Sequence, residues 1–535
     1  MSKHIKIIIV SCILITIFGT VLSLAQSVHG ESFGAIPQDK SVQDESVDTA
    51  WVRRYNGPGN LSDYAYAIAV DGSGNVYVTG PSEGSGTGFD YATIKYYPGG
   101  DTAWVRRYDG PTNDYDVAYA IAADGSGNVY VTGYSFGSGT GWDYATIKYY
   151  PNGDTAWVRR YNGPGNGYDV AGAIAVDGSA NVYVTGASYG SGTSYDYATI
   201  KYYPEGDTAW VRRYNGPGDS SDYALDIAVD GSGNVYVTGT SVGSVTGADY
   251  ATIKYYPGGD TAWLRRYNGT GNLDDGAYAI AADGSGNVYV TGYSSGSGTG
   301  WDYATIKYYA NGDTAWVRRY NGPVNDSDEA YAIAVDGSGD VYVTGGSYGS
   351  GTGDDFATIK YYPDGDTTWV RRYNGPVNGD DRAQDIAVDS SGNVYVTGRS
   401  AGSGTDDDYA TIKYYANGDT AWVRRYNGPG NGSDETSTMA VDGSGNVYVT
   451  GYSWGSGTEY DYATIKYIQY LCGDVNGDGV VDVGDVVYLI NYLYKNGSPP
   501  YPLEAGDVNS DGIVDVGDVV YLINYLFKGG LPPTC

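Results

Sequence analysis

Histidine is almost absent from this 535-residue chain, and its two histidines, His4 and His29, both lie near the N-terminus. A serine or cysteine nucleophile is usually activated by a neighbouring histidine, so that chemistry is excluded from the rest of the chain. Paired carboxylates stay possible, because glycoside hydrolysis needs only two of them and the chain has 63 Asp and Glu residues. No unique carboxylate pair stands out.

Positive charge is also scarce, with 31 Lys and Arg residues and a formal net charge of −32. This balance argues against nucleic acid and anionic membrane surfaces as partners, because both repel an acidic protein. It favours solubility and the attraction of cations.

Cysteine occurs three times. Cys472 and Cys535 bracket the last 64 residues and predict one disulfide in an oxidising compartment, the alternative being two free thiols. Closing that 63-residue separation would stabilise the segment by up to about 4 kcal/mol. Cys12 belongs to the N-terminal apolar run, and a lipoprotein attached there is disfavoured because the run continues past it.

The N-terminus predicts export. A basic start precedes an apolar run from Ile7 to Leu24, and Ser23-Leu24-Ala25 is similar to a signal-peptidase site. We expect a signal peptide over residues 1–25, a polar leader over 26–46, and a secreted, extracellular or surface-attached protein. The run is also long enough to be an uncleaved anchor.

The dominant feature is a repeat of 53 residues that runs eight times, each copy opening close to W-V-R-R-Y-N-G. A period of this length indicates a solenoid or a propeller. The tryptophans that mark the copies are Trp51, Trp104, Trp157, Trp210, Trp263, Trp316, Trp369 and Trp422.

Each copy contains four short runs rich in Val, Ile, Thr, Tyr and Trp, bounded by Gly, Pro, Asn and Asp; in the first copies they are 67–71, 75–80, 91–97 and 103–108. Four strands per repeat predict propeller blades. The repeat region begins on W-V-R-R-Y and ends after the third run, so its first strand completes the last blade. We therefore expect a closed eight-bladed all-β propeller over residues 47–468, with W-V-R-R-Y outermost and A-I-A-V-D innermost.

The segments D-G-S-G-N-V-Y-V-T-G (71–80) and D-Y-A-T-I-K-Y-Y (90–97), with their copies, resemble the bacterial β-propeller repeat family SBBP. The resemblance spans residues 50–467 and implies the fold. It says almost nothing about activity, because propellers host many functions.

Two connections vary between the copies, one between the second and third strands and one between successive blades. In an up-and-down blade both fall on one face, where we place any ligand surface. Five aromatic positions there suggest a glycan platform; the alternative is packing between neighbouring loops. The positions compared in the first connection are Phe89, Trp142, Tyr195, Ala248, Trp301, Asp354, Asp407 and Tyr460.

Three charged features of the repeat have competing interpretations. Asp63 and its seven copies, each before an innermost strand, would form an acidic ring near the channel mouth that holds a cation, or would cap their own turns. The arginine pairs protect the outer edge and can pair with carboxylates. The seventh copy carries Arg382, Arg399, Asp406 and Asp407, an asymmetric patch or an ordinary solvated loop.

Residues 469–535 contain two copies of a twelve-position loop of the EF-hand type. Oxygen ligands at positions one, three, five, seven, nine and twelve converge on one point, and glycine at six permits the reversal. The spacing predicts two Ca²⁺ ions, with the position-seven residues giving a backbone carbonyl. The ligands in order are Asp474, Asn476, Asp478, Val480, Asp482 and Asp485, then Asp507, Asn509, Asp511, Ile513, Asp515 and Asp518.

A helical pattern follows each loop, none precedes the first, and position twelve is Asp rather than Glu. This small all-α module resembles a type I dockerin, which implies calcium-dependent binding to a cohesin-like module. The paired recognition positions imply two possible binding orientations, although a Val-Gly pair replaces the Ser-Thr type. These positions are Val483, Gly484, Ile490, Asn491 and Lys495, then Val516, Gly517, Ile523, Asn524 and Lys528.

The leading hypothesis is a secreted, non-catalytic propeller that binds a glycan or protein and is anchored through its dockerin. One rival is a dockerin-bearing polysaccharide-degrading enzyme, a glycoside hydrolase. The other is a structural spacer or surface-layer component.

Overall fold

The computed structural model describes residues 45–535, so the predicted signal peptide and all but the end of the leader lie outside the described residues. Residues 45–471 form eight four-stranded antiparallel sheets. The chain-order bounds of their strands are β1 Glu45–Tyr55, β2 Ala67–Val70, β3 Val76–Glu83, β4 Phe89–Tyr96, β5 Thr102–Tyr108, β6 Asp116–Ala123, β7 Val129–Gly137, β8 Gly141–Tyr149, β9 Thr155–Tyr161, β10 Asp169–Val176, β11 Val182–Tyr189, β12 Tyr195–Tyr202, β13 Thr208–Tyr214, β14 Asp222–Val229, β15 Val235–Val242, β16 Ala248–Tyr255, β17 Thr261–Tyr267, β18 Asp275–Ala282, β19 Val288–Ser295, β20 Trp301–Tyr308, β21 Thr314–Tyr320, β22 Asp328–Val335, β23 Val341–Gly349, β24 Gly353–Tyr361, β25 Thr367–Tyr373, β26 Asp381–Val388, β27 Val394–Ala401, β28 Asp407–Tyr414, β29 Thr420–Tyr426, β30 Asp434–Val441, β31 Val447–Trp454 and β32 Tyr460–Leu471.

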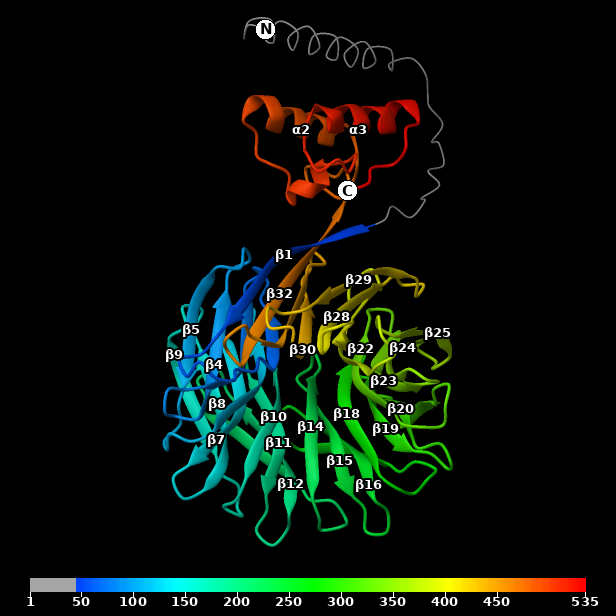
Figure 1. The fold of residues 1–535 in the computed structure, drawn as a ribbon. Coiled ribbons are helices and arrows are strands. Elements are labelled where there is room, and N and C mark those ends of the chain that lie inside the picture. The colour runs from blue at the N-terminus through cyan, green and yellow to red at the C-terminus, as the bar shows by residue number, and fades with distance from the viewer. Residues whose placement is uncertain (1–44) are drawn as a thin grey trace, which may run out of the picture. The chain divides into compact units, whose positions relative to one another are not determined.

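The ring closes as the repeat predicts. Blades one to seven are consecutive sets of four strands, from β2–β5 to β26–β29, and blade eight has the order β30-β31-β32-β1. Figure 1 shows β1, from the start of the described chain, beside β32. Their pairing runs from Tyr55 opposite Tyr462 to Glu45 opposite Leu471, beyond both ends of the expected 47–468. The eight-bladed fold is confirmed.

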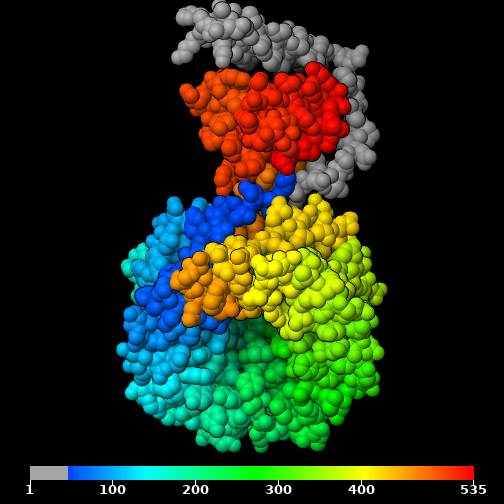
Figure 2. All heavy atoms as spheres, in the orientation of Figure 1, coloured from blue at the N-terminus to red at the C-terminus, as the bar shows by residue number. Residues whose placement is uncertain are grey.

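The strand order within the blades is also as expected. A-I-A-V runs form one edge of each sheet and W-V-R-R-Y runs form the other. Each A-I-A-V strand contacts its counterparts in both neighbouring blades, so these strands line the centre, where small side chains fit the crowded space. The space-filling view shows the propeller hollowed at this centre (Figure 2).

Aromatic side chains fill the space between blades. Trp104 on the outer strand of blade one packs between Tyr77 of its own blade and Tyr149 of blade two, with ring centroids 6.2 and 5.9 Å away. The buried Tyr91 hydroxyl donates to the Ala145 carbonyl of blade two at 3.1 Å. The contacts recur around the ring, so large buried aromatic area joins each blade to the next.

Residues after β32 form a two-helix module. Helices α2 (Val483–Lys495) and α3 (Val516–Lys528) each begin at an aspartate cap and end at a left-handed residue, Asn496 or Gly529. A 3-10 turn, Leu503–Gly506, lies between them in sequence. The small core contains Val475, Val486, Leu489, Val508, Val519 and Leu522. Within residues 45–535, no helix combines the length and apolar character that crossing a membrane requires.

Candidate functional sites on the propeller face and in the C-terminal loops

The two variable connections lie on the same face, as the repeat predicts. Trp142, at the start of β8, packs against Tyr168 in the connection that enters blade three, with ring centroids 4.6 Å apart. The Asn166 side-chain amide in that connection donates to the Gly139 carbonyl at 3.3 Å. Each hairpin thus contacts the entry loop of the next blade.

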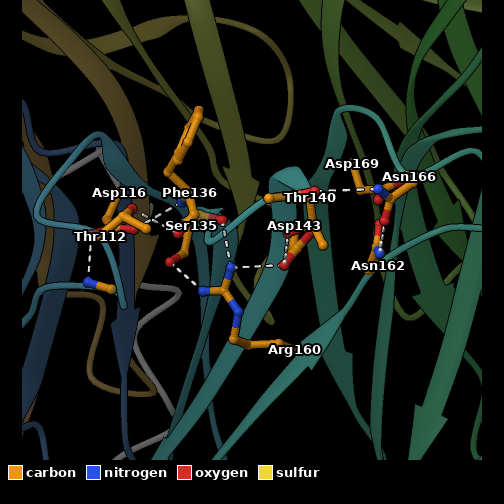
Figure 3. Close-up of polar contacts among 12 residues, drawn as sticks. Thr112, Asp116, Ser135, Phe136, Thr140, Asp143, Arg160, Asn162, Asn166 and Asp169 are labelled. Atoms are coloured by element: carbon orange, nitrogen blue, oxygen red, sulfur yellow. Dashed lines mark hydrogen bonds and ion pairs between the residues drawn. The ribbon is translucent and has the colours of Figure 1, made fainter.

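The second arginine of each outer-strand pair fixes this face. Arg160 donates to the Ser135 hydroxyl, to the Ser135 carbonyl at 2.8 Å and to the Asp143 carboxylate at 2.9 Å (Figure 3). The side chains of Arg160 and Asp143 are both largely buried. The same ion pair, at 2.6–2.9 Å, joins Arg54–Asp461, Arg107–Asp90, Arg160–Asp143, Arg213–Asp196, Arg266–Asp249, Arg319–Asp302, Arg372–Asp355 and Arg425–Asp408.

The expected pairing with carboxylates is therefore present for the second arginine of each pair, which does not protect the edge. The first arginine of a pair does remain near the edge: Arg159 lies over Trp157, 5.7 Å from the ring centroid, and donates to the Gly206 carbonyl at 2.6 Å. The second turns inward because alternate residues of a strand face opposite sides.

The repeated aspartates before the innermost strands cap their turns. Asp116 accepts from Gly110 N at 2.5 Å and from Phe136 N at 3.2 Å (Figure 3), and Asp63 accepts from Gly57 N at 2.6 Å. Asp63 and Asp116 are 0% and 1% exposed, so they do not form the open acidic ring that we considered. Burial raises the pKa of each to about 6, despite the hydrogen bonds that favour the ionised form.

The raised pKa of Asp63 predicts that the stability of the propeller depends on pH. Its folded pKa of about 6 exceeds the ordinary aspartate pKa of 3.8, so its contribution to stability is fully present below about pH 4 and is lost as the pH rises through 6. Relative to Asp63→Asn, which cannot ionise, wild-type unfolding free energy should fall by up to about 3 kcal/mol between pH 4 and 7. Urea unfolding at each pH measures this difference, with the exposed Asp101→Asn as control. A pH-independent difference would contradict the assignment.

One junction carries an extra carboxylate. Asp90, Asp109 and Asp116 bring one oxygen each within 4.8 Å of one another, and Asp109 stands where the other seven copies have Asn. The Arg107 guanidinium contacts Asp90 at 2.6 Å and offsets part of this charge. We regard the group as part of the loop-fixing network.

The five predicted aromatic positions pack against their neighbours and also leave surface exposed. Tyr64 links the blades around the closure, with ring centroids 5.5 Å from Tyr460 and 6.0 Å from Phe89. Trp301 packs on Tyr293 at 4.8 Å yet remains 39% exposed. The packing between neighbouring loops is therefore present, while some ring faces still meet solvent; a glycan platform stays a prediction.

The charged residues of the seventh copy do not form one patch, because its two arginines pair with carboxylates of different blades. Arg399 pairs with Asp407 at 2.7 Å, whereas Arg382 pairs with Asp354 of blade six at 2.5 Å. A cavity of about 250 Å³ opens beside the second pair. Sequence comparison missed this cavity, although Gly346, at a position held by tyrosine in three other copies, was a signal for it.

The two C-terminal loops have matching geometry. Asp474 accepts from Gly477, Asp478 and Gly479 amides at 2.8–3.0 Å, and Asp507 repeats two of these contacts in the second loop. At position twelve, Asp485 accepts from the Val475, Asn476 and Asp482 amides at 2.7–3.0 Å. Asp518 accepts from the corresponding Asn509 and Asp515 amides.

Each loop is thus a tight turn that gathers hard oxygen donors, a donor set that suits calcium. Among the described residues, three carboxylates come within 4.8 Å of one another only at the blade junction above, so the loop carboxylates stand further apart. Like charges repel, and a bound cation would offset the repulsion between these carboxylates. Burial raises the pKa of both Asp485 and Asp518, against the effect of their backbone hydrogen bonds.

The predicted disulfide is present: Cys472 and Cys535 are bonded, with Cα atoms 5.7 Å apart. It joins the two ends of the two-helix module. Since the module has only a small apolar core, this covalent link contributes a large share of its stability.

The recognition positions of the module lie on the helices with different exposure. Val483 and Val516, at the first turns of α2 and α3, are 46% and 42% exposed, whereas Ile490 and Ile523 are partly buried. The resemblance missed further exposed apolar positions one and three turns along the same helices. These are Val487, Tyr494, Val520 and Phe527.

The protein belongs to the class of closed eight-bladed β-propellers, and a small module of two loop–helix units follows the propeller. The described termini of the propeller meet in one blade, and the helical module continues from β32.

Comparison with protein families supplies the particular assignment. The beta-propeller repeat family SBBP matches residues 50–86, 104–139, 209–244, 262–298, 368–404 and 421–457, and the dockerin type I domain matches residues 472–527. The chain therefore contains SBBP β-propeller repeats and a C-terminal type I dockerin domain, a calcium-binding domain whose partners are cohesins. No curated protein matches it.

Solved structures match the propeller at low identity. The β-propeller domain of the trilobed protease from Pyrococcus furiosus is 8% identical, with a TM-score of 0.40 over 68% of this chain and 98% of that chain. The α-L-arabinanase of Penicillium chrysogenum, complexed with arabinobiose, is 9% identical, with a TM-score of 0.33 over 55% and 91%. These likenesses carry no argument about function.

Proposed function

We propose that the protein is a secreted, non-catalytic propeller that a calcium-loaded dockerin anchors to a cohesin-like partner. The variable face then meets a glycan or protein ligand at the place of attachment. The observation that carries this proposal is the duplication of the loop–helix unit. Both units have the same cap, two position-twelve contacts in common and similarly exposed first-turn valines.

Two Ca²⁺ ions would be held by the residues named from the loop spacing, with Asp474 and Asp507 at position one and Asp485 and Asp518 at position twelve. When bound, each ion would offset part of the negative charge of its loop and fix the start of the following helix. Because Asp482 and Asp515 cap α2 and α3, loop order and helix position are coupled.

Two equivalent surfaces predict a specific result in a cohesin-capture assay. Val483→Glu with Lys495→Glu alters the α2 surface, and Val516→Glu with Lys528→Glu alters the α3 surface. Either pair alone should leave capture by an immobilised type I cohesin panel intact in calcium, because the other surface still binds. All four changes should weaken capture at least about 30-fold.

Calcium-dependent helicity of each variant serves as the folding control. Capture that survives all four substitutions would contradict the assigned surfaces. Capture that is lost with one pair would contradict two-way binding.

The role of the variable face is tested separately on the full chain. Binding of the full chain to sugars on a glycan array would support a ligand-binding role for the variable face. The absence of binding would favour the structural-spacer hypothesis. Release of sugar ends from a polysaccharide panel would instead support the glycoside hydrolase alternative.

A further inference from the structure

The cavity between blades six and seven is the most asymmetric feature of the variable face. Its walls come from the entry loop and β22, β23 and β24 of blade six, and from the start of blade seven. At about 250 Å³ it is smaller than the roughly 300–1,000 Å³ of pockets that enclose a drug-sized molecule. It therefore suits a single ring of a longer ligand.

A missing side chain opens this cavity. Gly346 pairs with Glu329 across β23 and β22, and blade eight has Tyr452 opposite Glu435 at the same position. A Cβ atom added at Gly346 would meet Arg382 Cγ at 3.4 Å and Asp354 Cβ at 3.9 Å, which are ordinary contacts. The space is thus one that a tyrosine fills elsewhere in the same protein.

The lining combines acidic groups with aromatic rings. Four carboxylates and one guanidinium line the cavity, and Arg382 forms an ion pair with Asp354 at 2.5 Å. Glu329 accepts from the Tyr278 hydroxyl of blade five at 3.3 Å, and burial raises its pKa. The acidic lining residues are Asp326, Glu329, Asp354 and Asp380.

Two tyrosines provide flat surfaces in this lining. Tyr331 stacks on Tyr278, with centroids 5.6 Å apart and planes 30° apart, which fixes its orientation. Tyr348 is 40% exposed. Such rings bind both the C–H face of a sugar and a cation.

We propose that this cavity binds an amino sugar of the glucosamine type, with a free ammonium group, within a polymer that crosses the variable face. The ammonium group lies among the carboxylates and offsets their excess charge, while the sugar ring packs on a tyrosine. A neutral sugar leaves that charge uncompensated, and a lysine side chain brings the charge without a ring. This inference rests on the ligand-binding role proposed for the variable face and gives it a substrate class.

Calorimetric titration of the full chain in calcium, at mildly acidic pH, tests the proposal with three probes. These are the β-1,4-linked hexamer of glucosamine, its fully N-acetylated form and hexalysine. The glucosamine hexamer should bind at least about tenfold more tightly than either other probe. Gly346→Tyr, which fills the cavity, and Glu329→Gln should each weaken its binding at least about tenfold.

Matched controls are available in the repeat. Thr240→Tyr in blade four introduces the same side chain at the equivalent strand position, and Glu435→Gln repeats the charge change in blade eight; neither should alter binding. An unchanged melting temperature shows that Gly346→Tyr folds.

Each other outcome overturns the proposal. Equal binding of the N-acetylated hexamer indicates a neutral glycan, and equal binding of hexalysine indicates a peptide. If the glucosamine hexamer does not bind, or if Gly346→Tyr and Glu329→Gln both still bind it, the cavity is not the binding site. Cohesin capture is measured on the same samples, so its retention shows that the anchoring function stands when the cavity inference fails.

Discussion

Removal of calcium is expected to unfold the dockerin domain while the propeller stays folded. The carboxylates of each loop repel one another without the ion, and the aspartates that cap α2 and α3 belong to those same loops. Calcium at a thousandfold excess over Kd stabilises the folded domain by about 4 kcal/mol for each site. Chelator should therefore abolish amide-exchange protection in both helices and also cohesin capture.

The double variant Asp474→Ala with Asp507→Ala should reproduce the effect of chelator in the presence of calcium, because it removes position one from both loops. Glu504→Ala, an exposed acidic residue outside the loops, is the matched control and should change nothing. If protection in α2 and α3 were the same with calcium and with chelator, the metal assignment would be wrong. Protection in the strands is measured in the same experiment and should not respond.

Arg160→Ala should destabilise the propeller far more than Arg159→Ala, although the two residues are adjacent. Arg160 compensates the buried Asp143 and binds the Ser135 carbonyl, so its removal leaves a buried charge unpaired at a cost of about 3–5 kcal/mol. Arg159 lies near the edge, and its loss should cost about 1 kcal/mol. Urea unfolding gives both values.

Amide exchange should locate the damage in the hairpin and entry loop that Figure 3 shows around Arg160. Asp143→Asn removes the charge and should restore part of the stability when it is added to Arg160→Ala. Equal effects of the two single substitutions, or no rescue by Asp143→Asn, would show that the ion pair is not what fixes these loops.

The repeat made the architecture predictable because its information is local. Strand runs and turns recur every 53 residues, and a partial copy at each end allows only one way of completing a blade. Calcium loops are equally local, since all their proposed ligands fall within twelve positions. The pairing of β1 with β32 extended further than expected, to Glu45, because extra residues can lengthen a ladder without any change in the repeat pattern.

The roles of charged residues were less predictable. Arg159 and Arg160 look alike in sequence, and the strand pleat decides which one enters the protein. Asp63 could have faced a channel or capped a turn, and the fold places it under its own loop, where Gly57 N donates to it.

By itself, the sequence determined the number of blades, the closure of the ring and the type of module that follows, because spacing along the chain specifies all three. Only the tertiary structure decided which charges are buried and where the variable face opens. Glu329 and Arg382 meet at one cavity although they belong to different blades. Packing between successive blades brings such residues together, and no local pattern specifies that packing.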